Sequence, residues 1–408
     1  MVAFHFPPYV GSSGVQRTLR FAEQLPHFGW RPVVLTATPR AYGRDFARST
    51  EEIAGVTVER CFALDAAHAF SLMGRYPRAL AMPDRWSSWA IGARWRATGL
   101  LAKHKPAVIW STYPIATAHL VGGHLSRIGR LPWVADFRDT MVDDSFPRDE
   151  RVRRAYSRVE ATTLRDCARA VMTAPGAVNL YASRYPAFRD RLRLIANGYD
   201  EESFQSAPAA GTGVAHNGPR LLLHSGVVYP HERDPRPLFD AIRLLRAHGQ
   251  VGPERLRLRF RASGHDAFLA REIERCGLAD MIEIAPALGY KQALGEMLGA
   301  DGLLLLQGDT CNHQIPAKLY EYLRAGRPIL GLACPVGDTA AELRRARVAP
   351  IVPLEDAAAI GKALLEFVAQ VERDEAVLPD PGVVAQLSRV SRTQELGALL
   401  DEVSGQRH

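Results

Sequence analysis

The chain has 408 residues, of which 47% are hydrophobic and 23% charged, and its formal net charge is +7. This composition is typical of a water-soluble globular protein, and the length favours two or more domains. The positive charge, carried almost wholly by arginine, suits a surface that attracts phosphorylated ligands or anionic lipid. The sequence has no nucleic-acid motif in its expected context, so we expect no nucleic-acid partner.

The five cysteines are scattered and never form a C-x-x-C pair. This argues against a disulfide framework or a structural zinc site, and we expect no metal. The sequence has no apolar run long enough to cross a bilayer and no signal-peptide pattern at its start. We therefore expect a cytoplasmic protein.

Strand-like and helix-like segments alternate through the first half of the chain. Strands are expected at residues 2–6, 31–37, 56–61, 107–112 and 133–137. Helical patterns lie between them, at residues 11–25 and 117–129 among others. Strands that alternate with helices predict βαβ units and a parallel sheet.

The second half begins the same pattern again. Strands are expected at residues 220–226, 256–264, 281–287, 302–308, 328–334 and 349–354, with a helix at residues 235–249. An Ala-, Gly- and Pro-rich stretch at residues 205–219 is typical of a linker.

The predicted fold class is therefore α/β, with two Rossmann-like domains. We expect an N-terminal domain at residues 1–204 and a second domain at residues 220–385. A C-terminal helix at residues 386–408 is expected to pack back on the first domain. Ligands of such domains bind outside the carboxyl ends of the strands.

A glycine-rich turn, GSSGVQR, follows the first expected strand. Gly11 and Gly14 allow a sharp turn and a close approach to a ligand, and Ser13 lies where the helix begins. The spacing supports neither a dinucleotide fingerprint nor a P-loop. A tight turn without a ligand is the more frequent outcome for such a motif.

The stretch WVADFRD places Asp136, Arg138 and Asp139 at the end of an expected strand. Two interpretations are equally supported. The three side chains could line a ligand crevice, or an internal Asp–Arg pair could hold the loop together.

The stretch HQIPAKLYEYLRAGRPILGL follows the expected strand GLLLLQ. Pro316 suits the first turn of a helix, whose free N–H groups and positive dipole end favour a diphosphate. Lys318 adds a charge, and Glu321 lies on the same side of the helix. A surface Lys–Glu pair is the alternative, but the segment is otherwise strongly apolar. Arg233, in the turn GVVYPHERDPRPLF, could meet the same phosphates.

These motifs together resemble glycosyltransferase family 4, the retaining enzymes of the GT-B fold. The resemblance is carried, in order, by the opening FPPYVGSSGVQRTLRFAEQLPHFGWRPVVLT, then PDRWSSW, WVADFRD, IANGYDEESF and IPAKLYEYLRAGRPIL. It covers nearly the whole chain and is closest to the bacterial branch that acts on cell-surface polysaccharides.

The resemblance implies roles for particular residues. Glu321 matches the glutamate that accepts hydrogen bonds from the donor ribose, and His313 occupies the place of a preceding glutamate that faces the donor sugar. Arg233 resembles a lysine that binds the donor diphosphate, while Val227 or Val228 replaces the neighbouring arginine. Lys318 would restore that charge. Gly11, Ser13 and Gly14 would lie on the donor side, whereas Asp136, Arg138 and Asp139 would lie on the acceptor side.

The implied activity is transfer of a sugar from a nucleoside-diphosphate sugar to a glycan or a polyprenyl-diphosphate-linked acceptor in surface polysaccharide biosynthesis, without a metal or another cofactor. Two alternatives remain: a nucleotide-sugar 2-epimerase of the same fold, and a scaffold that has lost catalysis.

Residues 70–105 are rich in arginine and lysine and contain Trp86, Trp89 and Trp95. A helix that lies on an anionic bilayer has this composition. The resemblance favours peripheral attachment to the inner face of the membrane. Alternatively, the tryptophans pack on the domain core.

Overall fold

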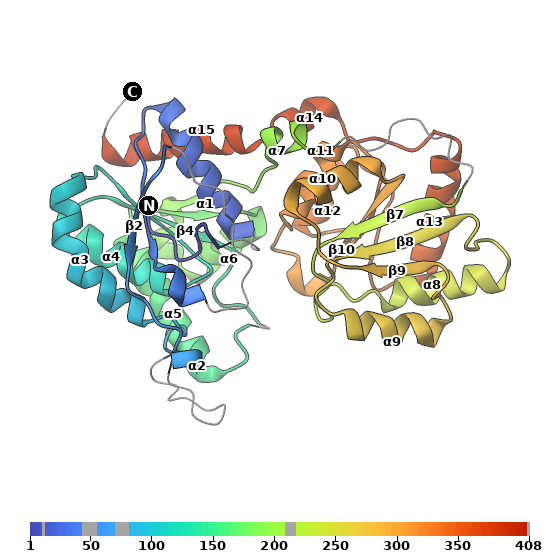
Figure 1. The fold of residues 1–408 in the computed structure, drawn as a ribbon, viewed down its shortest axis with the longest axis horizontal. Coiled ribbons are helices and arrows are strands. Elements are labelled where there is room, and N and C mark those ends of the chain that lie inside the picture. The colour runs from blue at the N-terminus through green and yellow to red at the C-terminus, as the bar shows by residue number, and fades with distance from the viewer. Residues whose placement is uncertain (10–12, 43–54, 70–80, 145, 209–217, 406–408) are drawn as a thin grey trace. The chain divides into compact units, whose positions relative to one another are not determined.

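The computed structural model describes residues 1–408 except 10–12, 43–54, 70–80, 145, 209–217 and 406–408. The chain divides into two compact units (Figure 1). The first unit consists of Met1–Asn197 and Arg389–His408, and the second of Gly198–Ser388.

The first unit is built on parallel strands. Their bounds are β1 Val33–Ala37, β2 Thr57–Cys61, β3 Ile109–Thr112, β4 Trp133–Arg138, β5 Arg169–Met172 and β6 Leu192–Leu194. β1 pairs with β2, and β3 to β6 form a ladder in chain order. Val2 bridges Leu35 of β1 and Ser111 of β3, so it joins the two groups of strands. The result is the parallel α/β arrangement expected from the sequence.

The strand predicted at residues 2–6 is reduced to this single bridge. Beyond Ala3 the backbone leaves the ladder, because the Phe4 carbonyl accepts hydrogen bonds from the hydroxyls of Thr36 and Tyr42, at 2.8 and 2.7 Å. Side-chain donors thus replace the neighbouring strand.

Helices surround these strands. Their bounds are α1 Ser13–Gln24, α2 Ala66–Ala69, α3 Ser88–His104, α4 Thr117–Gly129, α5 Glu150–Asp166, α6 Pro175–Arg184 and α15 Arg389–Ser404, with 3-10 turns η1 Leu25–Phe28, η2 Pro39–Tyr42 and η4 Pro186–Arg191. The core contains fully buried aromatic side chains, among them Phe137 and Tyr181.

The last helix, α15, is part of the first unit and packs against α1 and η1. Trp30 Nε1 donates a hydrogen bond to Asp401 Oδ1 at 2.8 Å, and Thr393 Oγ1 donates to Gln24 Oε1 at 2.8 Å. Leu396 and Leu400 join a core cluster with Phe21 of α1. The end of the chain therefore completes the first core.

The second unit is a six-stranded parallel sheet in the order β12-β11-β10-β7-β8-β9. Its strands are β7 Arg220–Ser225, β8 Leu256–Arg261, β9 Ile282–Ala285, β10 Gly302–Gln307, β11 Ile329–Ala333 and β12 Ile351–Val352. Counted from β7, this is the doubly wound order 3-2-1-4-5-6, in which the chain reverses direction across the sheet after the third strand. The reversal places β10 directly beside β7.

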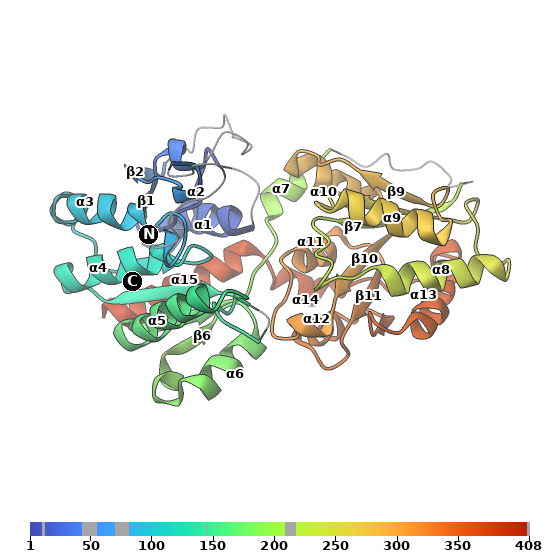
Figure 2. The same ribbon diagram turned by 90° about the horizontal axis from the view of Figure 1, so that it is seen from below.

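Helices flank this sheet as well, with α8 packed on both α9 and α13 (Figure 2). The helices are α7 Glu201–Gln205, α8 Arg236–Ala247, α9 Asp266–Cys276, α10 Tyr290–Gly299, α11 Lys318–Ala325, α12 Asp338–Arg345, α13 Ala357–Glu372 and α14 Pro381–Ala385, with the 3-10 turn η5 Asp309–Cys311. Leu303 to Leu306 of β10 are completely buried, as the apolar run predicts for a central strand.

The boundary between the units lies at residues 197 and 198, upstream of the linker predicted at residues 205–219. α7 belongs to the second unit because Glu201 forms an ion pair with Arg324 of α11, at 2.6 Å, and because α7 packs on α10. Residues 209–217 of the predicted linker lie outside the described residues. The return to the first unit comes at residue 389, close to the predicted start of the C-terminal helix at residue 386.

Candidate functional site

The strand order of the second unit singles out one position for a ligand. β7 and β10 are neighbours, with Leu223 opposite Leu303. The strands that follow β7 in sequence, β8 and β9, lie on one side of it, whereas β10 to β12 lie on the other side. The connection from β7 leads to α8, and the connection from β10 leads to α11. In open α/β sheets, ligands bind outside the carboxyl ends of the strands at this switch point.

Several predicted residues lie there. Arg233 is in the loop between β7 and α8, His313 is in the connection from β10 to α11, and Lys318 and Glu321 are in the first turn of α11. The structure adds His224 near the end of β7 and Tyr290 at the start of α10. We call Lys318, Glu321, Arg233, His224 and Tyr290 the switch-point cluster.

The Lys318 amine lies under the turn that follows β7. Its Nζ is 3.0 Å from Nε2 of His224. Gly226, in that turn, has φ +109°, and a Cβ built there would lie only 3.2 Å from Lys318 Nζ. The amine is therefore directed at backbone that only glycine accommodates without strain.

The cluster is an electropositive environment. Burial lowers the pKa of Lys318 well below its usual range, the charge of Arg233 lowers it further, and Glu321 acts in the opposite direction. Burial likewise lowers the pKa of His224, and Lys318 and Arg233 add to the effect. An anion that binds beside these cations would stabilise their charged forms.

Arg233 is held beside the end of β10. Its Nε donates to Gln307 Oε1 at 3.3 Å and its Nη1 to the Val227 carbonyl at 3.2 Å. The guanidinium also lies over the Tyr229 ring, 5.4 Å from the ring centre. These contacts fix the position of the charge while the side chain stays partly exposed.

Glu321 is oriented by α10. The Tyr290 hydroxyl donates to Glu321 Oε1 at 2.8 Å, and Glu321 is half-buried. On the next residue of α11, the Tyr322 hydroxyl accepts a hydrogen bond at 2.7 Å from the backbone N–H of Ser225, the last residue of β7. Hydrogen bonds therefore connect α11 both to α10 and to the end of β7.

The start of α11 differs from the prediction in one respect. We expected free N–H groups in the first turn after Pro316, but the N–H of Leu319 donates to the Pro316 carbonyl at 2.9 Å and that of Tyr320 to the Ala317 carbonyl at 3.2 Å. A tight 3-10 turn at the helix start engages them. Side chains, rather than these two N–H groups, therefore supply the polar atoms at this position.

In the first unit, only part of the glycine-rich turn can be described. Gly11 lies outside the described residues, and Ser13 is the first residue of α1. Gly14 is buried in the first turn of α1, where its carbonyl accepts a hydrogen bond from Thr18 Oγ1 at 3.1 Å.

The three charged residues at the end of β4 have different surroundings. Asp136 is fully buried and accepts hydrogen bonds from Arg17, at 2.9 and 3.1 Å, and from Thr112, at 2.8 Å. The internal Asp–Arg pair considered above therefore exists, but the arginine comes from α1. Asp136 is already engaged and does not face a crevice.

Arg138 is the last residue of β4, and Asp139 follows it. Arg138 is buried with φ +61°, an uncommon backbone conformation for a side chain of this kind. Its Nη1 donates to the Tyr113 carbonyl at 3.2 Å, and burial lowers its pKa. Asp139 is half-buried beside it. At the end of β4, Asp136 and Arg138 are thus both buried and hydrogen-bonded, and Asp139 is the most exposed of the three.

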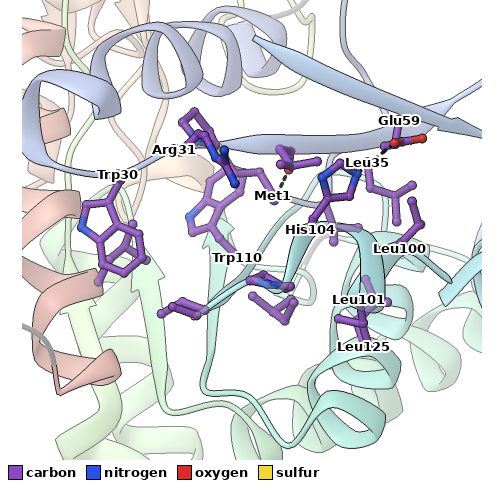
Figure 3. A pocket seen from close by; sticks show the side chains of 18 of the residues that line it. Met1, Trp30, Arg31, Leu35, Glu59, Leu100, Leu101, His104, Trp110 and Leu125 are labelled. Atoms are coloured by element: carbon purple, nitrogen blue, oxygen red, sulfur yellow. Dashed lines mark hydrogen bonds and ion pairs between the residues drawn. The ribbon is translucent and has the colours of Figure 1, made fainter. Parts of the chain in front are cut away.

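A cavity of about 130 Å³ lies at the amino ends of the first unit's strands, opposite to their carboxyl ends (Figure 3). Trp30, Trp110, Leu100 and Leu125 are among the mostly apolar side chains that line it, and His104 lies 2.9 Å from Glu59 at its border. The cavity borders Val33 and Ile109, the first residues of β1 and β3. Since ligand crevices of parallel sheets lie at the carboxyl ends, it is not the candidate site.

Sequence reasoning missed His224 and Tyr290 as members of the site. His224 had a signal, because a polar residue near the end of the apolar run RLLLHSG needs a buried partner. Tyr290 had none, because only the fold brings the start of α10 to α11. Among the described residues, no group of three His, Cys, Asp or Glu side chains could hold a metal ion, and no helix is long and apolar enough to cross a membrane.

Comparison with known proteins places this geometry in context. Residues 13–198 match the family model of the glycosyl transferase 4-like domain. No curated protein sequence matches the chain. A sucrose-phosphate synthase from Thermosynechococcus elongatus is 15% identical, with a TM-score of 0.69 over 99% of this chain and 99% of that one.

Two further structures align over almost the whole chain. A trehalose 6-phosphate synthase from Burkholderia multivorans is 14% identical, with a TM-score of 0.66 over 99% of this chain and 96% of that one. The Anabaena protein HepE, solved with UDP and glucose, is 15% identical, with a TM-score of 0.65 over 98% of this chain and 100% of that one. Together they confirm the fold expected from the sequence.

Proposed function

We propose that the chain, which has the GT-B fold and matches the glycosyl transferase 4-like domain at residues 13–198, is a glycosyltransferase that transfers a sugar from a nucleoside-diphosphate sugar bound at the switch-point cluster. One observation carries the proposal. Lys318 and Arg233 bring two cations, and Glu321 a carboxylate, to the carboxyl ends of β7 and β10.

Each group suits one part of the donor. Cations and a diphosphate attract one another strongly at a partly buried site, so Lys318 and Arg233 would bind the diphosphate. A carboxylate accepts hydrogen bonds from ribose hydroxyls, which suits Glu321. His313, in the connection between β10 and α11, would face the donor sugar. HepE was solved with UDP, and UDP is accordingly the first nucleotide to test.

We propose transfer with retention of configuration. The bond between the sugar C1 and the phosphate oxygen breaks while the acceptor oxygen bonds to C1 on the same face. The acceptor proton passes to the leaving phosphate. Negative charge therefore grows on the diphosphate in the transition state, where Lys318 and Arg233 stabilise it. This chemistry needs no protein nucleophile and no metal.

The first unit would bind the acceptor, with Arg138 and Asp139 on the acceptor side and the glycine-rich turn on the donor side. The basic surface suits an acceptor that carries phosphate, such as a glycan on a polyprenyl diphosphate. Its place would be the inner face of the membrane, in surface polysaccharide biosynthesis.

Attachment to that membrane would use the outer face of α3. Trp89 is fully buried and Trp86 is half-buried, with its Nε1 donating to the Ala41 carbonyl, so these two tryptophans pack on the domain. Trp95 is 86% exposed, and Ile91, one turn earlier, is 58% exposed. Arg94 lies beside them. An exposed tryptophan and isoleucine next to an arginine suit the headgroup region of an anionic bilayer.

The experiment is to incubate the protein with UDP-, GDP- and ADP-sugars, chosen first by thermal shift, and to analyse the products by NMR. Transfer to an added glycan acceptor with the donor's anomeric configuration supports the proposal. A C2-inverted sugar formed without acceptor identifies an epimerase. Tight donor binding without any product identifies a scaffold that has lost catalysis.

A further inference from the structure

Each nitrogen of the buried imidazole of His224 lies within hydrogen-bond distance of a partner, and the ring also interacts with the backbone of Gly226. Nδ1 lies 2.9 Å from the carbonyl oxygen of Leu304 on β10, and Nε2 lies 3.0 Å from Lys318 Nζ. A carbonyl only accepts, so Nδ1 must carry the hydrogen. Because burial and the nearby cations keep the ring neutral, Nε2 has a lone pair and accepts from the Lys318 amine.

The two contacts restrict both side chains. His224 is completely buried and lies tilted against Phe260, with 5.6 Å between the ring centres, so its surroundings restrict the ring. A lysine side chain has four rotatable bonds and normally loses much rotamer freedom when it binds a ligand. A fixed acceptor beneath the amine removes part of that cost before the ligand arrives.

We propose that His224 is a positioning residue, which accepts a hydrogen bond from Lys318 and so holds the amine under the Gly226 turn, ready for a diphosphate. The inference rests on the proposed function, because it assumes that the diphosphate of the donor meets Lys318. The other charged groups that face this pair are Arg233, from the loop after β7, and Glu321, on α11. His224 itself lies beneath the amine and does not touch the donor.

Two substitutions separate positioning from a purely structural role. In His224→Asn, the side-chain amide can still donate to the Leu304 carbonyl but cannot reach Lys318. In His224→Gln, the longer side chain can place its oxygen near the position of Nε2 and accept from Lys318, while the Leu304 contact is lost. If His224 has only a structural role, His224→Asn should weaken UDP binding less than His224→Gln does. If His224 positions Lys318, His224→Gln should weaken UDP binding less.

The test is the dissociation constant of UDP, measured by calorimetry on the full chain. We expect His224→Asn to bind UDP about tenfold more weakly than the wild type, which corresponds to the loss of one hydrogen bond, and His224→Gln to stay within about threefold. In a Lys318→Ala background, His224→Asn should have no further effect, because the residue through which it acts is gone.

His119→Asn is the matched control. His119 is another buried histidine, in α4 of the first unit, where Nδ1 lies 2.8 Å from Ser111 Oγ. Its substitution should leave UDP binding unchanged. If His224→Asn binds UDP like the wild type, or if its effect persists in the Lys318→Ala background, the inference is wrong and the proposed function stands. If the wild type does not bind UDP or any other nucleoside diphosphate, both fail.

Discussion

The Tyr290 hydroxyl, at the start of α10, donates a hydrogen bond at 2.8 Å to the Glu321 carboxylate on α11. A carboxylate held in this way accepts hydrogen bonds from hydroxyl groups, as binding of a ribose requires. Tyr290, at the start of α10, thus orients the carboxylate at the start of α11.

Glu321→Ala should therefore weaken UDP binding by about 1.5–3 kcal/mol, the range for hydrogen bonds to charged groups. Tyr290→Phe keeps the ring and removes only the orienting bond, so the loss should be smaller, about 0.5–1.5 kcal/mol. Calorimetry measures both effects, and thermal unfolding checks that the fold persists. Equal UDP affinity in Glu321→Ala and the wild type would remove Glu321 from the nucleotide site.

Binding of UDP should weaken as the pH rises. Burial and Arg233 lower the pKa of Lys318 in the free protein, whereas a bound diphosphate would raise it again. Between these two pKa values the free amine is neutral and must take up a proton on binding, so affinity falls by up to about tenfold for each pH unit. Below the free-state pKa the amine is already charged, and its contribution is complete.

Calorimetry of UDP binding across pH, in two buffers with different ionisation enthalpies, measures this proton uptake. Lys318→Arg is the control, because arginine keeps its charge at every accessible pH and should flatten the dependence. A wild type that takes up no proton at any pH would show that Lys318 does not meet the diphosphate.

The Arg17–Asp136 pair should matter for stability. Arg17 is 3% exposed and Asp136 is completely buried, so removing the arginine leaves an unpaired carboxylate in the core. Arg17→Met is expected to destabilise the first unit by about 3–5 kcal/mol. Arg165→Met removes an arginine from an exposed pair with Asp166 and should unfold like the wild type. Urea unfolding, followed by the fluorescence of the first unit's tryptophans, compares the two, and equal stability would show that Asp136 tolerates the loss of Arg17.

The outer face of α3 predicts salt-sensitive binding to anionic vesicles. Trp95→Ala combined with Ile91→Ala should reduce co-sedimentation with anionic vesicles several-fold, because both side chains are exposed and carry no packing role in the core. The buried Trp89 is not a suitable target, since its loss would damage the fold. Equal binding of the wild type to neutral and anionic vesicles would contradict the attachment proposal.

Much of the fold could be predicted because alternating strand and helix patterns are local. The β10 run GLLLLQ and the α11 pattern after it have the expected bounds to within a few residues. The strand at residues 2–6 was overpredicted, because nothing in that stretch shows that Thr36 and Tyr42 compete for the Phe4 carbonyl. Side chains more than thirty positions away decide where that strand ends.

For the candidate site as well, local features could be predicted from the sequence and contacts between distant residues could not. Lys318 and Glu321 were recognisable because charges in an apolar helical segment need a reason. The partners of such charges were not, because they depend on the sheet order: Lys318 meets His224, which lies 94 positions away. Asp136 was placed on the acceptor side, yet it pairs with Arg17, 119 positions away, and no sequence pattern links the two.

A crystal structure of the chain with UDP tests the central claim most directly. The account predicts the diphosphate beside Lys318 and Arg233, at the carboxyl ends of β7 and β10, with the ribose hydroxyls on Glu321. UDP bound elsewhere, with the switch-point cluster unoccupied, would contradict it.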